Sequence, residues 1–184
     1  MNAIDPSTAD DFSTTNHGRS IGLSAIAALS DNDFLVLERD NRSLGVEVKA
    51  APLHKRIYRI NLQGATNVKN ISLAGSDTLP ANVVAVQKSA EHDLLADLKA
   101  RGITVPEKME ALAIGPRLAD GRYLVLVGTD NDYSVTQSGS GEQLDVCVNP
   151  VTDARTQVAL DADCPSGSAL IPGYLMSYAA DLGH

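Results

Sequence analysis

The sequence lacks any long apolar segment and is poor in basic residues. No run of about 18 or more apolar residues occurs, so we expect no helix that spans a membrane. There are 15 Lys and Arg against 23 Asp and Glu, a formal net charge of −8. This imbalance disfavours nucleic-acid binding, which requires a basic stripe on the protein. It also disfavours a large anionic substrate, unless a bound cation offsets the repulsion.

The start of the chain lacks the features of a signal peptide. Residues 1–20 have neither a basic beginning nor an apolar core, and are rich in Ser, Thr, Asp and Asn. This composition predicts a flexible N-terminal segment, followed by one domain over residues 21–184.

Cysteine is scarce, and no CxxC pair or Cys/His metal spacing is present. The two cysteines, Cys147 and Cys164, have sixteen residues between them. A disulfide that closes such a loop would stabilise the fold by roughly 3 kcal/mol. It would also place the protein in an oxidising compartment, either extracellular or periplasmic. Two buried free thiols are the alternative.

The apolar runs that do occur are short and rich in Val, Ile, Leu and Tyr, which is typical of β-strands. One helix is expected at residues 89–102, where three leucines share a face and Gly102 provides a stop. Asp-Gly at residues 120–121 predicts a hairpin turn. The chain is therefore predicted to be all-β with one short helix. Strands are expected at residues 33–38, 55–62, 82–87, 109–114, 122–128, 143–148, 155–160 and 173–179.

An internal repeat refines this fold prediction. Residues 24–41 and 110–131 both contain a small-residue apolar run, an acidic turn, a strongly apolar run and then Asp-Asn. The two Asp-Asn pairs lie ninety positions apart, twice the length of a β-propeller blade of about 45 residues. We therefore predict a β-propeller of about four blades, or a fragment of one, with a generic β-sandwich as the alternative.

A fragment would leave sheet edges open. If N-terminal blades are missing, another copy of the chain or the missing blades would have to cover the exposed edges. A homo-oligomer is thus one expected assembly.

Several segments together resemble the phytase-like esterase family, whose members are described as having esterase-like activity of phytase. The resemblance covers most of residues 20–182 and implies a β-propeller that hydrolyses phosphate or carboxylic esters. It also implies that this chain corresponds to the C-terminal portion of longer members. One departure is Ala111 after Glu110, where the family commonly has glycine. The segments are "FLVLERD" (34–40), "KRIYRINLQGATNV" (55–68), "VQKSAEHDLLADL" (86–98), "PEKMEALAIGPRLADGRYLVLVGTDNDYS" (106–134) and "LIPGYLMSYAADL" (170–182).

Acidic side chains follow or end the apolar runs, and the ends of inner propeller strands converge at the central channel. Close carboxylates repel one another unless a cation lies among them. Ca²⁺ suits such a site because it takes about six to eight oxygen ligands, and Mg²⁺ would suit it if several waters remain. Asp130-x-Asp132-x-Ser134 is not an EF-hand, because the sixth position is Val135. The predicted metal ligands are Glu38, Asp40, Glu110, Asp130, Asn131 and Asp132.

These residues lead to two functional hypotheses. In the first, the chain is a hydrolase of phosphate or carboxylic esters assisted by a divalent cation. Glu110 and Asp130 would be catalytic, and Arg39 and Lys88 would bind the anionic small-molecule substrate. In the second, it is a non-catalytic β-propeller binding module with a structural calcium site, because fold does not determine function. Any single Asp or Asn after a strand can also be an ordinary turn former.

Overall fold

A computed structural model describes residues 21–46, 51–73 and 78–183, so the flexible segment expected at residues 1–20 lies outside the described residues. The described residues form eleven β-strands, arranged in three antiparallel sheets, and one α-helix. This confirms the prediction of a mostly β chain with one short helix. The propeller, with its four blades, stays a prediction.

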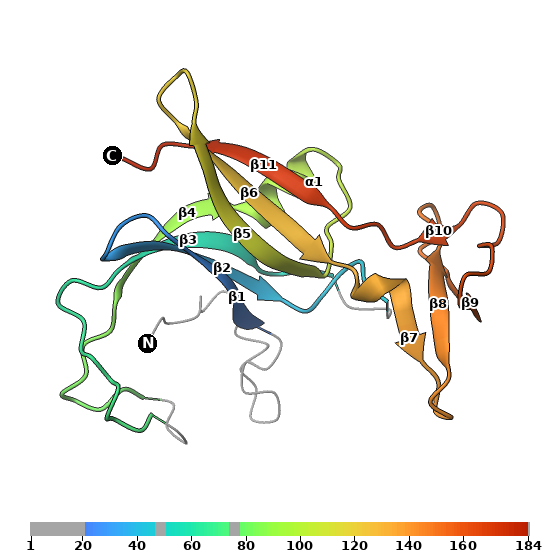
Figure 1. Cartoon of the computed structure of the whole chain (residues 1–184), viewed down its shortest axis with the longest axis horizontal. Coiled ribbons are helices and arrows are strands. Elements are labelled where there is room, and N and C mark those ends of the chain that lie inside the picture. The colour runs from blue at the N-terminus through green and yellow to red at the C-terminus, as the bar shows by residue number, and fades with distance from the viewer. Residues whose placement is uncertain (1–20, 47–50, 74–77, 184) are drawn as a thin grey trace.

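The first sheet is a four-stranded meander, shown in blue to green in Figure 1. Its strands run in sequence order, β1 (Ile21–Ala28), β2 (Asp33–Asp40), β3 (Lys55–Asn61) and β4 (Gln87–Asp93). Ser30 helps to close the first turn, because its Oγ accepts the backbone N–H of Asp33 at 3.1 Å. The acidic turn predicted between the first two apolar runs is thus present.

The second sheet combines a hairpin with a strand from the end of the chain. β5 (Lys108–Arg117) and β6 (Tyr123–Asp130) pair across the predicted turn, where Gly121 has a φ of 91° that favours glycine. β11 (Leu175–Ala180) pairs with the other side of β6. The hairpin is therefore confirmed, while the third strand comes from a distant part of the sequence.

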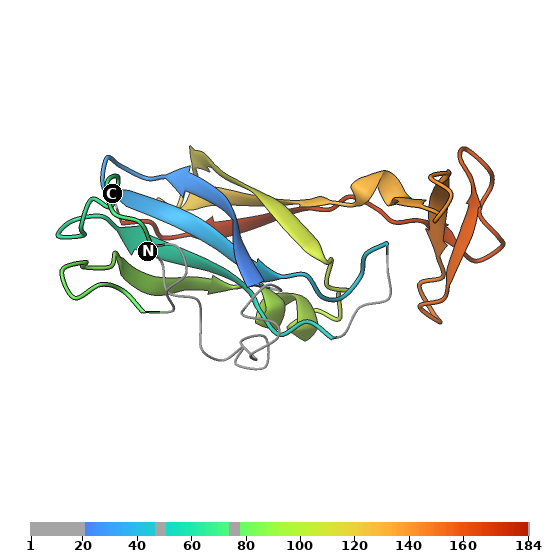
Figure 2. The same ribbon diagram turned by 90° about the horizontal axis from the view of Figure 1, so that it is seen from below.

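The third sheet lies at one end of the molecule, apart from the other two (Figures 1 and 2). It contains β7 (Val135–Gln137), β8 (Gln143–Val148), β9 (Arg155–Ala159) and β10 (Ala169–Leu170). A short 3₁₀ turn, η2 (Asp132–Ser134), links β6 to β7. The predicted disulfide between Cys147 and Cys164 is confirmed, with an Sγ–Sγ distance of 2.10 Å.

The main core lies between the first two sheets, which Figure 2 shows stacked on one another. Alternate residues of a strand point to one face, so Leu35 and Leu37 of β2 pack toward Val125 and Val127 of β6. α1 (Leu94–Ala100) closes one side of this core with three buried leucines. The helix has seven residues, far fewer than the roughly 20 that cross a bilayer, and no other α-helix occurs in the described ranges.

The helix begins later than the sequence predicts. Residues 87–93 form β4 and pair with β3, so the expected helix at residues 89–102 is wrong in its first part. Asp93 caps the helix, because its Oδ1 accepts the N–H of Ala96 at 2.9 Å. Most of the strand expected at residues 82–87 is a loop, and pairing begins at Gln87.

Candidate functional site

The predicted site residues of β2 are divided between its two faces. Successive side chains of a strand point in opposite directions, so Glu38 and Asp40 share one face and Arg39 lies on the other. Glu38 and Asp40 are fully buried, whereas the side chain of Arg39 is 17% exposed. Two adjacent polar clusters result, one on each side of the first sheet.

Glu38 belongs to a buried cluster of charged and aromatic side chains. Its Oε1 pairs with the ammonium of Lys88, and its Oε2 lies 3.2 Å from Nε2 of His54. The Lys88 nitrogen also lies 3.9 Å from the centre of the Tyr58 ring. Lys88, predicted to bind substrate, is therefore bound to groups of the protein in this arrangement.

Asp40 is held by a buried lysine. Oδ1 of Asp40 lies 2.7 Å from Nζ of Lys55, and its Oδ2 accepts the backbone N–H groups of Leu53 and His54 at 2.7 Å each. Lys55 also donates to the carbonyl of Glu107 at 2.6 Å. Burial lowers the pKa of Lys55 to about 8, although the charge of Asp40 opposes that shift. Lys55 thus connects the end of β2 to the segment before β5.

Arg39 reaches the second sheet and pairs with Glu110 of β5. Glu110 sits at a β-bulge, because the register of β5 with β6 shifts between Met109 and Ala111. Ala111 pairs with Gly128, which has no side chain, so the alanine found in place of glycine is accommodated in the ladder. The carboxylate of Glu110 is 36% exposed and can reach solvent.

A cavity of about 390 Å³ adjoins the Arg39–Glu110 pair. Ser24 also lines it, but its Oγ donates to the carbonyl of Met109 at 2.8 Å and so links β1 to β5. The guanidinium can bind an anionic or oxyanion group, and the carboxylate can accept a proton. The lining residues are Ile21, Gly22, Leu23, Ser24, Arg39, Asn41 and Glu110.

The acidic residues after β6 shape a turn. Asp130 Oδ1 accepts the N–H of Asp132 at 2.8 Å, and Asn131 Oδ1 accepts the N–H of Tyr133 at 3.1 Å. The Nδ2 of Asn131 donates to the carbonyl of Ile171 at 2.7 Å. The side chains of Asp130 and Asn131 therefore stabilise this turn.

Lys108 lies among three of the predicted carboxylates. Its ammonium pairs with Asp132. Burial alone would lower the pKa of Lys108, but the hydrogen bond and charge of Asp132 outweigh burial and raise it. The charges of Asp130 and Glu110 act in the same direction. The sequence predicted that these three carboxylates converge with Glu38 and Asp40 around a cation. The three act together on the ammonium of Lys108.

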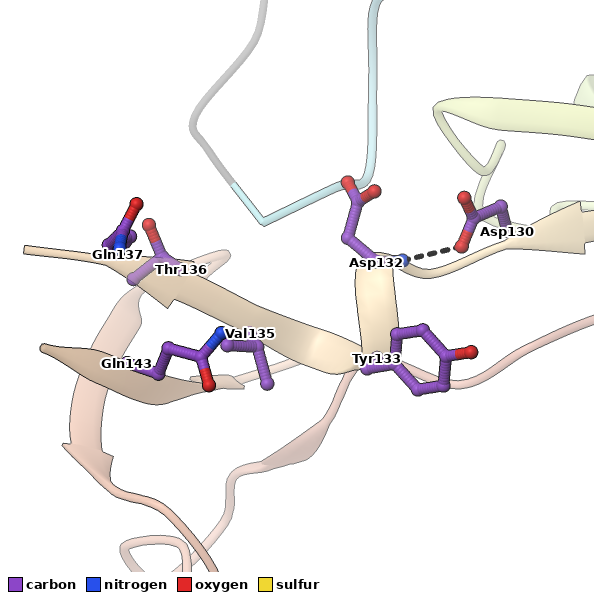
Figure 3. A pocket seen from close by; sticks show the side chains of 7 residues that line it. All are labelled: Asp130, Asp132, Tyr133, Val135, Thr136, Gln137 and Gln143. Carbon is purple, nitrogen blue, oxygen red and sulfur yellow. Dashed lines mark hydrogen bonds between the residues drawn. The ribbon is translucent and has the colours of Figure 1, made fainter. Parts of the chain in front are cut away.

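A second cavity of about 350 Å³ lies beside η2, and Figure 3 shows the side chains around it. Three consecutive residues, Asp132, Tyr133 and Ser134, have φ values of 52°, 54° and 61°. Each non-glycine residue in this left-handed region costs on the order of 1–3 kcal/mol. The lining residues are Asp130, Asp132, Tyr133, Val135, Thr136, Gln137 and Gln143.

The predicted metal ligands pair with basic side chains or with backbone N–H groups in this arrangement. Across residues 21–46, 51–73 and 78–183, no group of three or more His, Cys, Asp or Glu side chains is placed to hold a metal ion. Lys55 and Lys108 supply positive charge at the two acidic strand ends instead. Binding of Ca²⁺ or Mg²⁺ stays a prediction.

Sequence reasoning missed Lys55, Lys108 and His54. Lys108 had a usable signal, because it lies two positions before Glu110 near the start of an expected strand, where a counter-charge for the acidic residues could be sought. The partnership of Lys55 with Glu107 spans 52 positions and leaves no local pattern.

Comparison with known proteins gives one family. The family described as "Phytase-like: Esterase-like activity of phytase" matches residues 5–133, more than half of the chain. The matched range includes β1 to β6 and the Arg39–Glu110 pair, and it ends before β7. No curated protein and no solved structure matches the chain.

Proposed function

The chain belongs to the phytase-like esterase family, and from this membership we propose that it hydrolyses phosphate or carboxylic esters. The observation that carries the proposal is the pairing of Arg39 with Glu110 beside a cavity, within the matched residues. The bulge at Glu110 adds support, because β-bulges often re-aim a side chain next to an active site.

In the proposed reaction, Arg39 binds the substrate. Its planar guanidinium donates paired hydrogen bonds to a phosphate group, or to the oxygen that gains negative charge as a carboxylic ester is attacked. The ion pair with Glu110 has to open for this, and the partial exposure of both side chains permits the exchange. Asn41 lines the same cavity and can donate to an ester oxygen.

Glu110 acts as the general base. Its carboxylate accepts a proton from a water molecule as the water oxygen bonds to the phosphorus or carbonyl carbon. The bond to the ester oxygen breaks, and the departing alkoxide oxygen takes up the proton that Glu110 accepted, which gives the alcohol and restores the carboxylate. Asp130, the other predicted catalytic residue, lines the second cavity, and its catalytic role stays a prediction. Cation assistance likewise stays a prediction.

The test is a hydrolysis assay of the full chain on p-nitrophenyl phosphate, p-nitrophenyl acetate and phytate, with calcium and with EDTA. Glu110→Gln should lower kcat by about 100-fold or more, since it removes the base. Arg39→Met should mainly raise KM for the phosphate substrates. The matched control is Arg122→Met with Asp120→Asn, which breaks an exposed pair 2.7 Å apart at the β5–β6 turn. Equal losses in the control, or no turnover of any ester, would count against the proposal.

The second candidate is a non-catalytic binding module whose sheets are propeller blades. One observation favours it: each predicted carboxylate already pairs with a basic side chain or a backbone N–H. The acidic residues would then serve stability alone. Under this view Glu110→Gln lowers the melting temperature while the wild-type chain turns over none of the three esters.

The disulfide indicates an oxidising compartment, and we extend this to an extracellular or periplasmic location. Among the described strands, β1 and β4 each have one edge without a strand partner. Cover of these edges by a second copy or by further blades remains a proposal. Sedimentation of the chain tests it, and a monodisperse monomer that binds no hydrophobic dye would contradict it.

A further inference from the structure

Tyr133 is an exposed aromatic residue at the tip of η2. The residue is 90% exposed. Aromatic residues are scarce in this chain, which has five Tyr, two Phe and no Trp. Packing within the protein therefore does not account for a tyrosine at this position.

Backbone conformation does not account for it either. Tyr133 has a φ of 54°, where glycine or asparagine would be less strained. The turn is held from both sides by buried bonds: Ser134 Oγ donates to the carbonyl of Val146 at 2.8 Å and accepts the N–H of Ile171 at 2.7 Å. These bonds hold η2 in a strained conformation, in which Tyr133 is exposed to solvent. Strain of this kind is concentrated at functional sites.

The cavity beside Tyr133 is lined mostly with hydroxyl, amide and carboxylate groups. In Figure 3, Tyr133 lies at one end and Thr136 and Gln137 at the other, with Asp130 and Asp132 along one side. Among residues 21–46, 51–73 and 78–183, no hydrogen bond joins the side chain of Thr136 or Gln143 to another residue. These groups can both donate and accept.

The charged groups at this cavity disfavour both cationic and anionic ligands. Asp132 is matched by Lys108, so a cation would meet a lysine beside the carboxylates. An anion would meet the carboxylates of Asp130 and Asp132. A neutral ligand remains. The cavity offers it an aromatic face next to hydroxyl, amide and carboxylate groups, which suits a ring with an apolar face and several hydroxyl groups.

We propose that this cavity binds a neutral saccharide. The C–H face of a sugar ring stacks on Tyr133, its hydroxyl groups donate to Asp130, and they exchange hydrogen bonds with Thr136 and Gln143. The site is separate from the Arg39–Glu110 pair, and its existence does not depend on ester hydrolysis.

The experiment is titration of the ¹⁵N-labelled full chain with glucose, galactose, maltotetraose and cellotetraose, followed by amide chemical shifts. At least one tetrasaccharide should shift the amides from Tyr133 to Gln137 and that of Gln143. Tyr133→Ala should bind it about tenfold more weakly, and Tyr133→Phe should retain binding. Val151→Ala is the matched control, because Val151 is also 90% exposed and does not line the cavity.

Tyr133→Asn separates binding from folding. Asparagine tolerates a positive φ, so this variant should melt at or above the wild-type temperature and lose saccharide binding. Any of three results overturns the proposal. These are no shift with all four sugars, shifts located elsewhere, or a larger response of the same amides to spermidine or inorganic phosphate than to the tetrasaccharides.

Discussion

The ammonium nitrogen of Lys55 lies 2.7 Å from Oδ1 of Asp40, and both side chains are fully shielded from solvent. The same nitrogen donates to the carbonyl of Glu107, so one lysine joins β2, β3 and the segment before β5. A buried ion pair adds little compared with apolar residues of similar volume, but removal of one partner leaves a buried charge without compensation. The effect of breaking this pair is therefore expected to be large.

Lys55→Met should lower the free energy of unfolding by about 3–5 kcal/mol. The methionine fills a similar volume but leaves the carboxylate of Asp40 buried and unneutralised. Urea unfolding followed by circular dichroism measures the change, with exposed Lys99→Met as the control.

Asp40→Asn in the Lys55→Met background should restore part of the lost stability. The asparagine oxygen can still accept the N–H groups of Leu53 and His54, and the buried charge is gone. If the double variant is no more stable than Lys55→Met alone, the loss comes from packing and the electrostatic account fails.

The stability should also depend on pH through Lys55. Burial lowers its pKa to about 8 in the folded chain, whereas an unfolded lysine titrates near 10.4. Between these values the unfolded chain binds more protons, so the free energy of unfolding rises with pH, by up to about 3 kcal/mol. Deprotonation differs from the Lys55→Met substitution, because the neutral amine still donates hydrogen bonds to Asp40 and to the carbonyl of Glu107. The rise is absent below about pH 8.

Urea midpoints measured between about pH 7.5 and 11.5 test this pH dependence. Above about pH 10 the trend should reverse, because burial raises the pKa of Tyr178 to about 12 and the folded chain then binds more protons. Lys55→Arg should flatten the lower part of the profile, since a guanidinium does not titrate there. A flat wild-type profile from pH 8 to 10 would rule out the lowered pKa.

Much of the fold could be predicted because the signals are local. The Asp-Gly turn at residues 120–121 sets the β5–β6 hairpin, and a continuous apolar run, residues 34–37, identifies β2. The start of the helix was misplaced because β4 is polar and exposed, so its pairing with β3 leaves no apolar pattern. Asp93 alone marked the boundary, as a capping residue.

The candidate site was less predictable, because its partners come from distant positions. The approach of Glu110 to Asp130 follows from strands that pair, and the charges of both residues act on Lys108. The separation of Glu38 from Arg39 follows from strand alternation and could have been derived from the sequence. No local pattern reveals that Lys55 supplies positive charge to Asp40, because its partners Asp40 and Glu107 lie 15 and 52 positions away.

The competition between lysine and calcium can be measured at Lys108. EDTA should leave the melting temperature of the wild-type chain unchanged, because the ammonium already neutralises Asp132. Lys108→Gln should lower stability by about 1 kcal/mol, and calcium should restore part of the loss in this variant only. Lys69→Gln, at an exposed loop position, is the control. A fall in the wild-type melting temperature on EDTA addition would instead support the calcium site predicted from the sequence.

The disulfide should matter most in the third sheet, because the cluster of buried hydrophobic residues described there is small and consists of Val146, Val148 and Ile171. Cys147 is fully buried in β8 and its bond to Cys164 closes a short loop, so reduction should destabilise this sheet by about 3 kcal/mol. Hydrogen exchange with and without reductant should show faster exchange in β8 and β9, with β2 and β3 unchanged. A Cys147→Ala, Cys164→Ala variant should show the fast exchange already and respond no further to reductant. If the exchange in β8 of the wild-type chain is the same with and without reductant, the sheet is held by its packing against the rest of the molecule and the disulfide is dispensable.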